Sequence, residues 1–367
     1  MMRVAAFAGS AAVLMGCSGS SFTSSATGGA AGSGALGGAG AVGGGGGGGT
    51  AGGGATGGTG GTAGAGGASG GAGGASGGAG GAGGAGGGVG GAGGSGGAAC
   101  AADIKTDPIH CGECFHSCLG AACVNGYCAK TKVYSASGPV GLALDGANLY
   151  WGSDTNNEIR RAPKAGGGPT TQIIAEGSAV YYLAISGPNL FWATGAKDVK
   201  RQALTGGTVK VLEPGLGSPY GVAVFGGKAW VTEGSDAKVA VIDAVNGGEK
   251  ASFPLAAGSI PEGIATDGQT LFIAINSGSD IVTLPVTGGS VGTFASSQEK
   301  PAGVAVDGEW IYWTGQGTPG VLRKRKKGGG PIVELATDLN APTGVVVDAT
   351  HVYFAERNAN VIWRVPK

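Results

Sequence analysis

Four oxygen-bearing side chains, placed beside equivalent apolar segments of a repeated sequence, could together bind a metal ion. They are Asp154, Glu233, Glu262 and Asn276. Carboxylate and amide oxygens suit calcium, a hard ion that takes six to eight oxygen ligands. Polar loop residues that bind nothing are also common. We therefore expect no cofactor, with calcium as the alternative.

Three tyrosines and one arginine are candidates for contacting an organic ligand. Tyr181, Tyr182 and Tyr220 could form an aromatic platform for a sugar or a peptide, and Arg357 lies in an equivalent loop. Tyr182 departs from its siblings, because the five equivalent positions hold glycine. Compensatory packing would explain the same departure, so both interpretations stay open.

Residues for nucleophilic catalysis are scarce. Residues 131–367 contain one histidine, His351, and no cysteine. No Ser-His-Asp set can be argued around that histidine. Glycine pairs precede strands rather than helices, so no phosphate-binding loop qualifies. These features favour a binding module over an enzyme.

The elements that must position these side chains come from a repeat of about 40 residues. Equivalent anchor positions occur at 141, 182, 221, 263, 303 and 344, each inside a short strand of small apolar residues. An aromatic strand follows, such as Leu149-Tyr150-Trp151, and then two further strands separated by turns. Four short strands per repeat predict an all-β fold, a six-bladed β-propeller over residues 131–367.

The two ends of this region are predicted to meet. The last repeat stops after its third strand, and residues 131–137 match the missing fourth strand. Pairing them would close blade six and remove exposed sheet edges. In a propeller, the loops before the first strand and those between the second and third strands share one face. We therefore expect the candidate residues above to lie around the channel mouth.

Residues 100–128 form a separate small module with an even set of cysteines. These are Cys100, Cys111, Cys114, Cys118, Cys123 and Cys128. A segment this small needs cross-links to fold, so three disulfides are predicted, with all fifteen pairings open. A zinc site formed by Cys111, Cys114, His116 and Cys118 is the alternative.

The first 99 residues have the pattern of an export signal and a tether. Residues 1–16 carry Arg3 and an apolar stretch too short to span a bilayer, which predicts a signal peptide. Leu14-Met15-Gly16-Cys17 resembles a bacterial lipobox, which implies cleavage before Cys17 and lipidation of its sulfur. Residues 17–99 hold 44 of the 85 glycines and no charge, so we expect a disordered linker. A plain secretory signal and an adhesive glycine-rich segment are the alternatives.

Several motifs resemble known families. Tyr150-Trp151 and Tyr312-Trp313-Thr314 are similar to YWTD blades of lipoprotein receptors, whereas Pro219–Val224 resembles NHL and streptogramin-lyase blades. The lyases have seven blades, so their activity is not carried over. Propeller lactonases hold a metal through Glu, Asn and Asp, which implies Glu262, Asn276 and Glu233 or Asp154 here. The cysteine module resembles the motif of stigma-specific-type proteins, which implies a small extracellular knot.

The charge balance and the residue after Cys17 bear on the partners and the localisation of the protein. Equal numbers of acidic and basic residues, 23 each, give no basic field for nucleic acid. Ser18 follows the cysteine of the lipobox-like motif. In enterobacterial lipoproteins an aspartate at this position causes retention in the inner membrane, so the serine favours the outer membrane, on its periplasmic or outer face. The leading hypothesis is a monomeric, lipid-anchored binding or scaffolding module with an unknown protein, peptide or glycan ligand. The alternative is a calcium-dependent, lactonase-like hydrolase or lyase acting at the propeller mouth.

Overall fold

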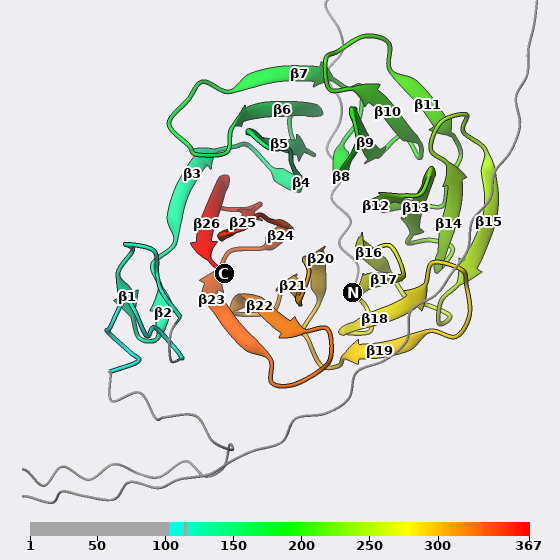
Figure 1. The fold of residues 1–367 in the computed structure, drawn as a ribbon. Helices are drawn as coiled ribbons and strands as arrows, with labels where there is room; N and C mark the ends of the chain where they lie inside the picture. The colour runs from blue at the N-terminus through cyan, green and yellow to red at the C-terminus, as the bar shows by residue number, and fades with distance from the viewer. Residues whose placement is uncertain (1–102, 114–115) are drawn as a thin grey trace, which may run out of the picture. The chain divides into compact units, whose positions relative to one another are not determined.

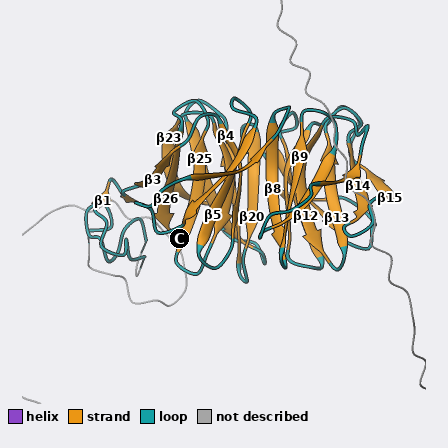
Figure 2. Cartoon of the chain, turned by 90° about the horizontal axis from the view of Figure 1, so that it is seen from above, coloured by secondary structure: helices purple, strands orange, loops and turns teal. Residues whose placement is uncertain are grey.

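Six four-stranded antiparallel sheets surround a central axis in the computed structural model, which describes residues 103–113 and 116–367 (Figure 1). This confirms the predicted six-bladed propeller. The strands of blades one to three are β4 (Pro139–Leu144), β5 (Asn148–Ser153), β6 (Glu158–Pro163), β7 (Thr171–Ala175), β8 (Val180–Ser186), β9 (Asn189–Thr194), β10 (Val199–Ala203), β11 (Lys210–Glu213), β12 (Pro219–Phe225), β13 (Lys228–Glu233), β14 (Lys238–Asp243) and β15 (Glu249–Pro254). Those of blades four to six are β16 (Pro261–Thr266), β17 (Thr270–Ile275), β18 (Asp280–Pro285), β19 (Gly292–Ala295), β20 (Pro301–Val306), β21 (Trp310–Gly315), β22 (Gly320–Lys326), β23 (Val333–Leu339), β24 (Pro342–Val347), β25 (His351–Glu356), β26 (Val361–Pro366) and β3 (Thr131–Ser135). The first strand of each blade lies innermost, and loops collect at the two ends of the strands (Figure 2).

Blade six is completed by the strand that precedes blade one, as predicted. β3 pairs antiparallel with β26, with Tyr134 opposite Ile362 and Ser135 opposite Val361. Lys130, just before β3, also forms an ion pair of 2.5 Å with Glu356 at the end of β25. The N-terminal side of the propeller is therefore joined to its last blade.

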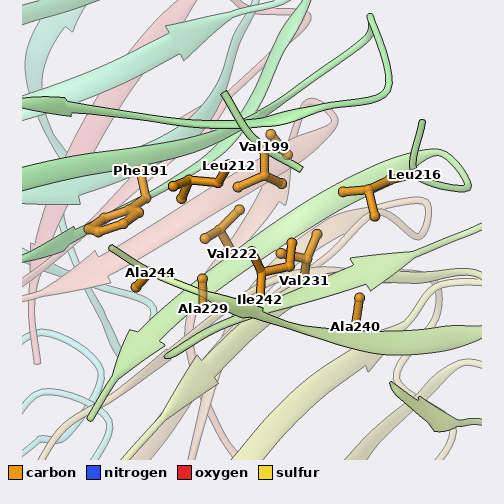
Figure 3. Close-up of a cluster of buried hydrophobic side chains, with 11 residues drawn as sticks. Phe191, Val199, Leu212, Leu216, Val222, Ala229, Val231, Ala240, Ile242 and Ala244 are labelled. Atoms are coloured by element: carbon orange, nitrogen blue, oxygen red, sulfur yellow. The ribbon is translucent and has the colours of Figure 1, made fainter. Parts of the chain in front are cut away.

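Apolar side chains from neighbouring blades fill the space between the sheets. Between blades two and three, Phe191 and Leu212 belong to the same buried cluster as Val222 and Ile242 (Figure 3). The predicted aromatic strands supply much of this packing, because Trp151 and its equivalents are almost fully buried. Burial of such side chains stabilises each blade only in contact with the next, so closure of the ring matters for every blade.

A bulge at the same place in every inner strand explains the repeated glycine. In β20, the register with β21 jumps between Pro301 and Val304, so Ala302 and Gly303 together oppose one residue. A methyl group on Gly303 would come well inside 3.0 Å of the Thr343 carbonyl oxygen on β24. Four other anchors, at 141, 221, 263 and 344, face the backbone of the next inner strand in the same way. Glycine is thus needed where neighbouring inner strands touch backbone to backbone.

Acidic residues after the inner strands tie neighbouring blades together at the opposite ends of those strands. In blade six, Asp348 accepts a hydrogen bond from the Tyr353 hydroxyl (3.2 Å). The same carboxylate forms an ion pair with Lys164 of blade one (3.0 Å). Although burial acts in the other direction, turn N–H groups and Lys164 lower the pKa of Asp348 below its ordinary value. Lys367–Asp307 and Lys327–Asp267 are equivalent inter-blade pairs. The predicted turns therefore also act as inter-blade clamps.

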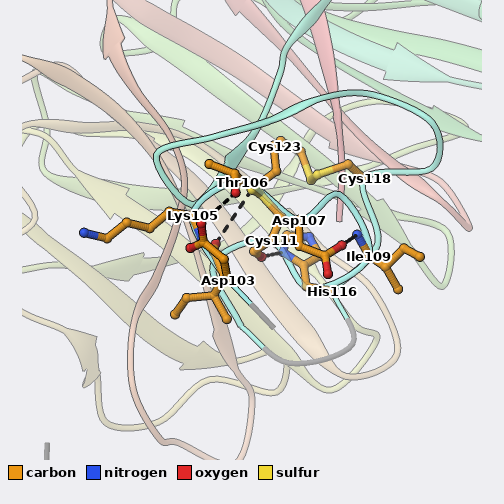
Figure 4. Close-up of a disulfide and its surroundings, with 11 residues drawn as sticks. Asp103, Lys105, Thr106, Asp107, Ile109, Cys111, His116, Cys118 and Cys123 are labelled. Atoms are coloured by element: carbon orange, nitrogen blue, oxygen red, sulfur yellow. Dashed lines mark hydrogen bonds between the residues drawn. A yellow bond between two sulfur atoms is a disulfide. The ribbon is translucent and has the colours of Figure 1, made fainter. Parts of the chain in front are cut away.

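The described part of the cysteine module contains two disulfides. Cys111 is bonded to Cys123 (Figure 4), and Cys118 is bonded to Cys128. The strands β1 (Cys123–Val124) and β2 (Tyr127–Cys128) form a two-stranded sheet (Figure 1). His116 Nδ1 donates to the Cys111 carbonyl oxygen (2.8 Å). The zinc alternative is therefore wrong for Cys111 and Cys118, because oxidised sulfurs cannot serve as thiolate ligands. Cys100 and Cys114 lie outside the described residues.

The predicted signal peptide, Cys17 and the linker through residue 99 also lie outside the described residues. Within the residues that are described, no helix has the length and hydropathy needed to cross a membrane.

Candidate functional site

The bulges place one residue of each inner strand at an equivalent position in the six blades. We call these six bulged residues the mouth ring: Val140, Tyr181, Tyr220, Glu262, Ala302 and Thr343. Bulges characteristically re-aim a side chain next to functional sites. Three small or aliphatic members occupy one part of the ring, and the larger polar members come from blades two, three and four.

Two tyrosines of the mouth ring pack against each other. The ring centroids of Tyr181 and Tyr220 are 5.1 Å apart, and their planes are tilted by 46°. Burial, and then the neighbouring Tyr181 and Glu262, raise the pKa of the Tyr220 hydroxyl. Tyr181, Tyr220 and Glu262 therefore form one patch across three consecutive blades.

Glu262 is held in place through its backbone. Thr232 Oγ1 accepts a hydrogen bond from the N–H of Gly221 (2.7 Å) and donates one to the carbonyl oxygen of Glu262 (2.6 Å). A Cβ atom at Gly221 would collide with that same carbonyl group. Blade three thus fixes the position from which the Glu262 side chain enters the mouth.

The Glu262 carboxyl is the most strongly perturbed acid of the mouth. Burial raises its pKa to about 7, and the Tyr182 hydroxyl opposes part of that rise. No Lys or Arg within the described residues forms an ion pair with Glu262. A carboxyl group with a pKa near neutrality changes charge within the physiological range, which suits either ligand binding or proton transfer.

Tyr182 occupies the second bulge position of blade two, where the other blades have glycine. Its side chain lines the central channel, a cavity of about 260 Å³ whose other walls are mainly Val, Ala, Leu and Ile from the inner strands. Burial and then Glu262 raise the pKa of Tyr182 well above its ordinary value. Its hydroxyl is buried close to Glu262, yet no group meets it in normal hydrogen-bond geometry. The side chain of Tyr182 therefore links the apolar channel to the acidic part of the mouth.

Glu233 serves the fold rather than the mouth. The residue is 1% exposed, and its Oε2 accepts a hydrogen bond from Gly217 N (2.5 Å) in the loop before β12. Its other oxygen lies 3.2 Å from Lys238 Nζ. Glu356, at the equivalent position of blade six, binds Asn340 N and Lys130 in the same manner. Both glutamates brace the loop that leads into an inner strand.

Asp154 and Asn276, the other two predicted metal ligands, have contacts of their own. Asp154 forms an ion pair of 2.6 Å with Arg357, joining the loops of blades one and six. The backbone N–H of Asn276 donates to Ile260 O (2.9 Å), and its buried Nδ2 has no partner among the described groups.

The described propeller also contains no three His, Cys, Asp or Glu ligand atoms within 4.8 Å of one another. Two of the four predicted calcium ligands, Glu233 and Asp154, are instead paired with the basic side chains of Lys238 and Arg357.

Sequence reasoning overlooked the distinction that sets Glu262 apart. It grouped Glu262 with Glu233, although only the latter has a basic partner. The position of Glu262 in the repeat could have distinguished the two residues. Glu262 directly precedes an anchor position, as every member of the mouth ring does. Glu233 instead ends the second strand of its blade, where the structure places loop-bracing groups.

No family model matches this chain, and no curated protein matches it. Solved structures with a similar fold include the calcium-binding protein regucalcin from Agrobacterium tumefaciens, with a TM-score of 0.54, 16% identity, and coverage of 65% of this chain and 93% of that one. A gluconolactonase from Xanthomonas campestris gives a TM-score of 0.54, 17% identity and coverage of 64% and 88%. Virginiamycin B lyase from Staphylococcus aureus gives a TM-score of 0.51 and 15% identity, and the match covers 65% of this chain and 98% of that one. At these identities the likeness is one of fold: the chain is similar to β-propellers that include binding proteins and enzymes.

Proposed function

We propose that this chain is a lipid-anchored binding protein of the bacterial cell envelope, whose propeller takes up a small ligand at the channel mouth. One observation carries the binding part of the proposal. The hydroxyl group of Tyr182 is buried beside the half-buried carboxyl group of Glu262 without a partner in normal hydrogen-bond geometry, and Tyr182 lines a channel whose side chains are mainly aliphatic. Buried polar groups without partners are costly, so a ligand that supplies them would bind favourably.

The anchoring part of the proposal rests on Cys17 and its lipobox-like context. Replacing the acylated sulfur removes the lipid chains, which contribute roughly 0.8 kcal/mol per buried methylene. We expect Cys17→Ser to move the protein from the membrane fraction to the soluble fraction after cell lysis. Ser18→Ala, at the adjacent position, should remain with the membrane. An unchanged distribution of Cys17→Ser would contradict lipid anchoring, and separation of the two membranes on a density gradient tests the outer-membrane assignment.

The binding part is tested by screening small molecules for stabilisation of the full chain against heat. A ligand at about 100 times its dissociation constant adds roughly 2.7 kcal/mol, or on the order of 5–10 °C for this propeller. We expect the shift to disappear when Tyr181 and Tyr220 are both changed to Ala, because their packed rings form one side of the mouth. Phe225→Ala is the matched control, since this exposed aromatic residue ends the same strand as Tyr220. Equal shifts in the double variant and the wild type would place the binding site elsewhere.

A second function is favoured by the pKa of about 7 at Glu262, which suits a general acid or base. A hydrolase or lyase using this carboxyl group would lose turnover in Glu262→Gln, because the amide cannot accept the proton. Propellers of similar fold include a gluconolactonase and a lyase. A lactone and ester screen with wild type and Glu262→Gln separates this function from simple binding: binding alone releases no product.

A further inference from the structure

The described glutamates whose side chains are almost fully buried each have a basic partner. Lys200 lies 2.7 Å from Glu176, Lys238 lies 3.2 Å from Glu233, and Lys130 lies 2.5 Å from Glu356. In each of these pairs the glutamate side chain is at most 5% exposed. Pairing compensates the desolvation of the charge. Glu262 differs from them, since no described basic side chain reaches it.

The surroundings of Glu262 attract positive charge. The faces of aromatic rings carry negative potential, and a cation placed over them gains free energy that increases when the site is desolvated. Tyr181 and Tyr220 present tilted, packed rings beside the carboxyl group. Tyr182 is 8% exposed, and its buried hydroxyl group lies close to Glu262 without a partner in normal hydrogen-bond geometry.

No described charge competes for this position. From β8 the group facing Glu262 is Tyr182, and from β12 it is Tyr220. On the other side, β20 contributes the buried, uncharged Ala302 to the mouth ring. Burial and Tyr182 account for the shifted titration of Glu262, without a contribution from any Lys, Arg, Asp or other Glu.

The channel below the mouth determines which cation fits. Its walls come from inner strands rich in Val, Ala, Leu and Ile, and its volume is about 260 Å³. A strongly hydrated metal ion would lose its water there without gaining the oxygens it needs. An organic cation keeps its charge on a nitrogen that alkyl groups surround, so its apolar part can enter the channel.

We infer that the mouth binds a small organic ammonium ion, with the charged nitrogen at Glu262 beside the tyrosines and the alkyl part in the channel. This inference rests on the proposed function, because it names the chemical class of the ligand at the same site. The ammonium ion supplies the basic partner that the other buried glutamates find within the chain.

Choline and its uncharged isostere, in which carbon replaces nitrogen, are the probes. Isothermal titration of the full chain should show choline binding at least about tenfold more tightly than the isostere, a difference of about 1.4 kcal/mol. Because the ionised carboxylate is required, choline affinity should fall about tenfold from pH 8 to pH 6. Glu262→Gln should lose both the preference and its pH dependence.

Two further variants sharpen the result. Tyr220→Phe keeps the ring face and should bind choline nearly as tightly as wild type, whereas Tyr220→Ala should bind it several-fold more weakly. Glu309→Gln makes the same charge change at a side chain that is 62% exposed, and it should have no effect.

The outcomes separate the two proposals. Equal, mouth-dependent binding of choline and the isostere would overturn the ammonium inference and retain the binding function. Choline binding that survives Glu262→Gln unchanged would overturn the inference as well. If neither probe binds at millimolar concentration and the small-molecule screen shows no mouth-dependent shift, both proposals fall.

Discussion

Glu262→Gln should make the protein more stable at about pH 8 and change its stability far less at about pH 5. The folded-state pKa of Glu262, about 7, lies above the ordinary glutamate pKa of 4.5. The folded state therefore binds this proton more tightly than the unfolded state. The resulting contribution to the free energy of unfolding is fully present below pH 4.5 and is lost as pH rises through 7. Glutamine keeps the shape of the side chain and carries no charge at any pH.

The expected gain follows from the size of that shift. Allowing for partial solvent access, ionisation of Glu262 costs about 2–3 kcal/mol at pH 8. For a propeller of this size, removing that cost should raise the melting temperature by roughly 4–10 °C. Thermal melts of the unliganded chain at the two pH values measure the effect directly.

Glu176→Gln is the matched control for this experiment. Glu176 is also buried, but it accepts hydrogen bonds from Lys200 Nζ (2.7 Å) and Trp192 Nε1 (2.8 Å). Neutralising it leaves the largely buried Lys200 with only Asp198, 3.9 Å away, as a counter-charge, so stability should fall at pH 8. A loss of stability in Glu262→Gln at pH 8 would show that the ionised carboxylate has a stabilising partner in the free protein, contrary to the structure.

Gly303→Ala should destabilise the propeller by about 3 kcal/mol or more, lowering the melting temperature by roughly 6–12 °C. The added methyl group would meet the Thr343 carbonyl oxygen, Val345 N at 3.0 Å and Gly344 Cα at 3.1 Å. All three are backbone atoms of β24, so no side-chain rotation relieves the collision. Blades five and six would have to separate at the axis, where closure of the ring leaves little freedom.

Gly308→Ala provides the comparison for Gly303→Ala. Gly308 lies in the turn between β20 and β21 of the same blade, and a methyl group there would touch nothing within 4 Å. Its stability should stay within about 0.5 kcal/mol of wild type. If Gly303→Ala also melted within a degree or two of wild type, the backbone contact between β20 and β24 would not be a requirement of the ring.

The fold could be predicted because its causes are local and repeated. Each blade carries its own anchor, turn and aromatic strand, so six copies of a weak pattern become a strong one. The closing strand was also predictable, since β3 and β26 together supply what one repeat lacks. The anchor glycines could be recognised by position, although only the structure shows that each faces the backbone of the next blade.

The site was only partly predictable, because pairing of charges depends on distances between blades. Tyr181, Tyr220 and Glu262 share one place in the repeat, and their proximity follows from the symmetry of the ring. Asp154 and Arg357 are 203 positions apart in the chain, and nothing local in the sequence pairs them. The same holds for Lys238 and Glu233, where a short loop decides that the carboxyl group is compensated.

Completion of blade six by β3 also sets an order in time for folding. Lys130 and Glu356 pair across 226 positions of sequence, and the neighbouring ladder between β3 and β26 spans a similar separation. This ladder cannot form until almost the whole chain is available, and contacts of such long range are slow to form. Until then, β3 has no partner strand, and its open edge can pair with another chain. A chain that ends before Val361 would keep that edge permanently, so premature termination favours association between copies over a smaller propeller.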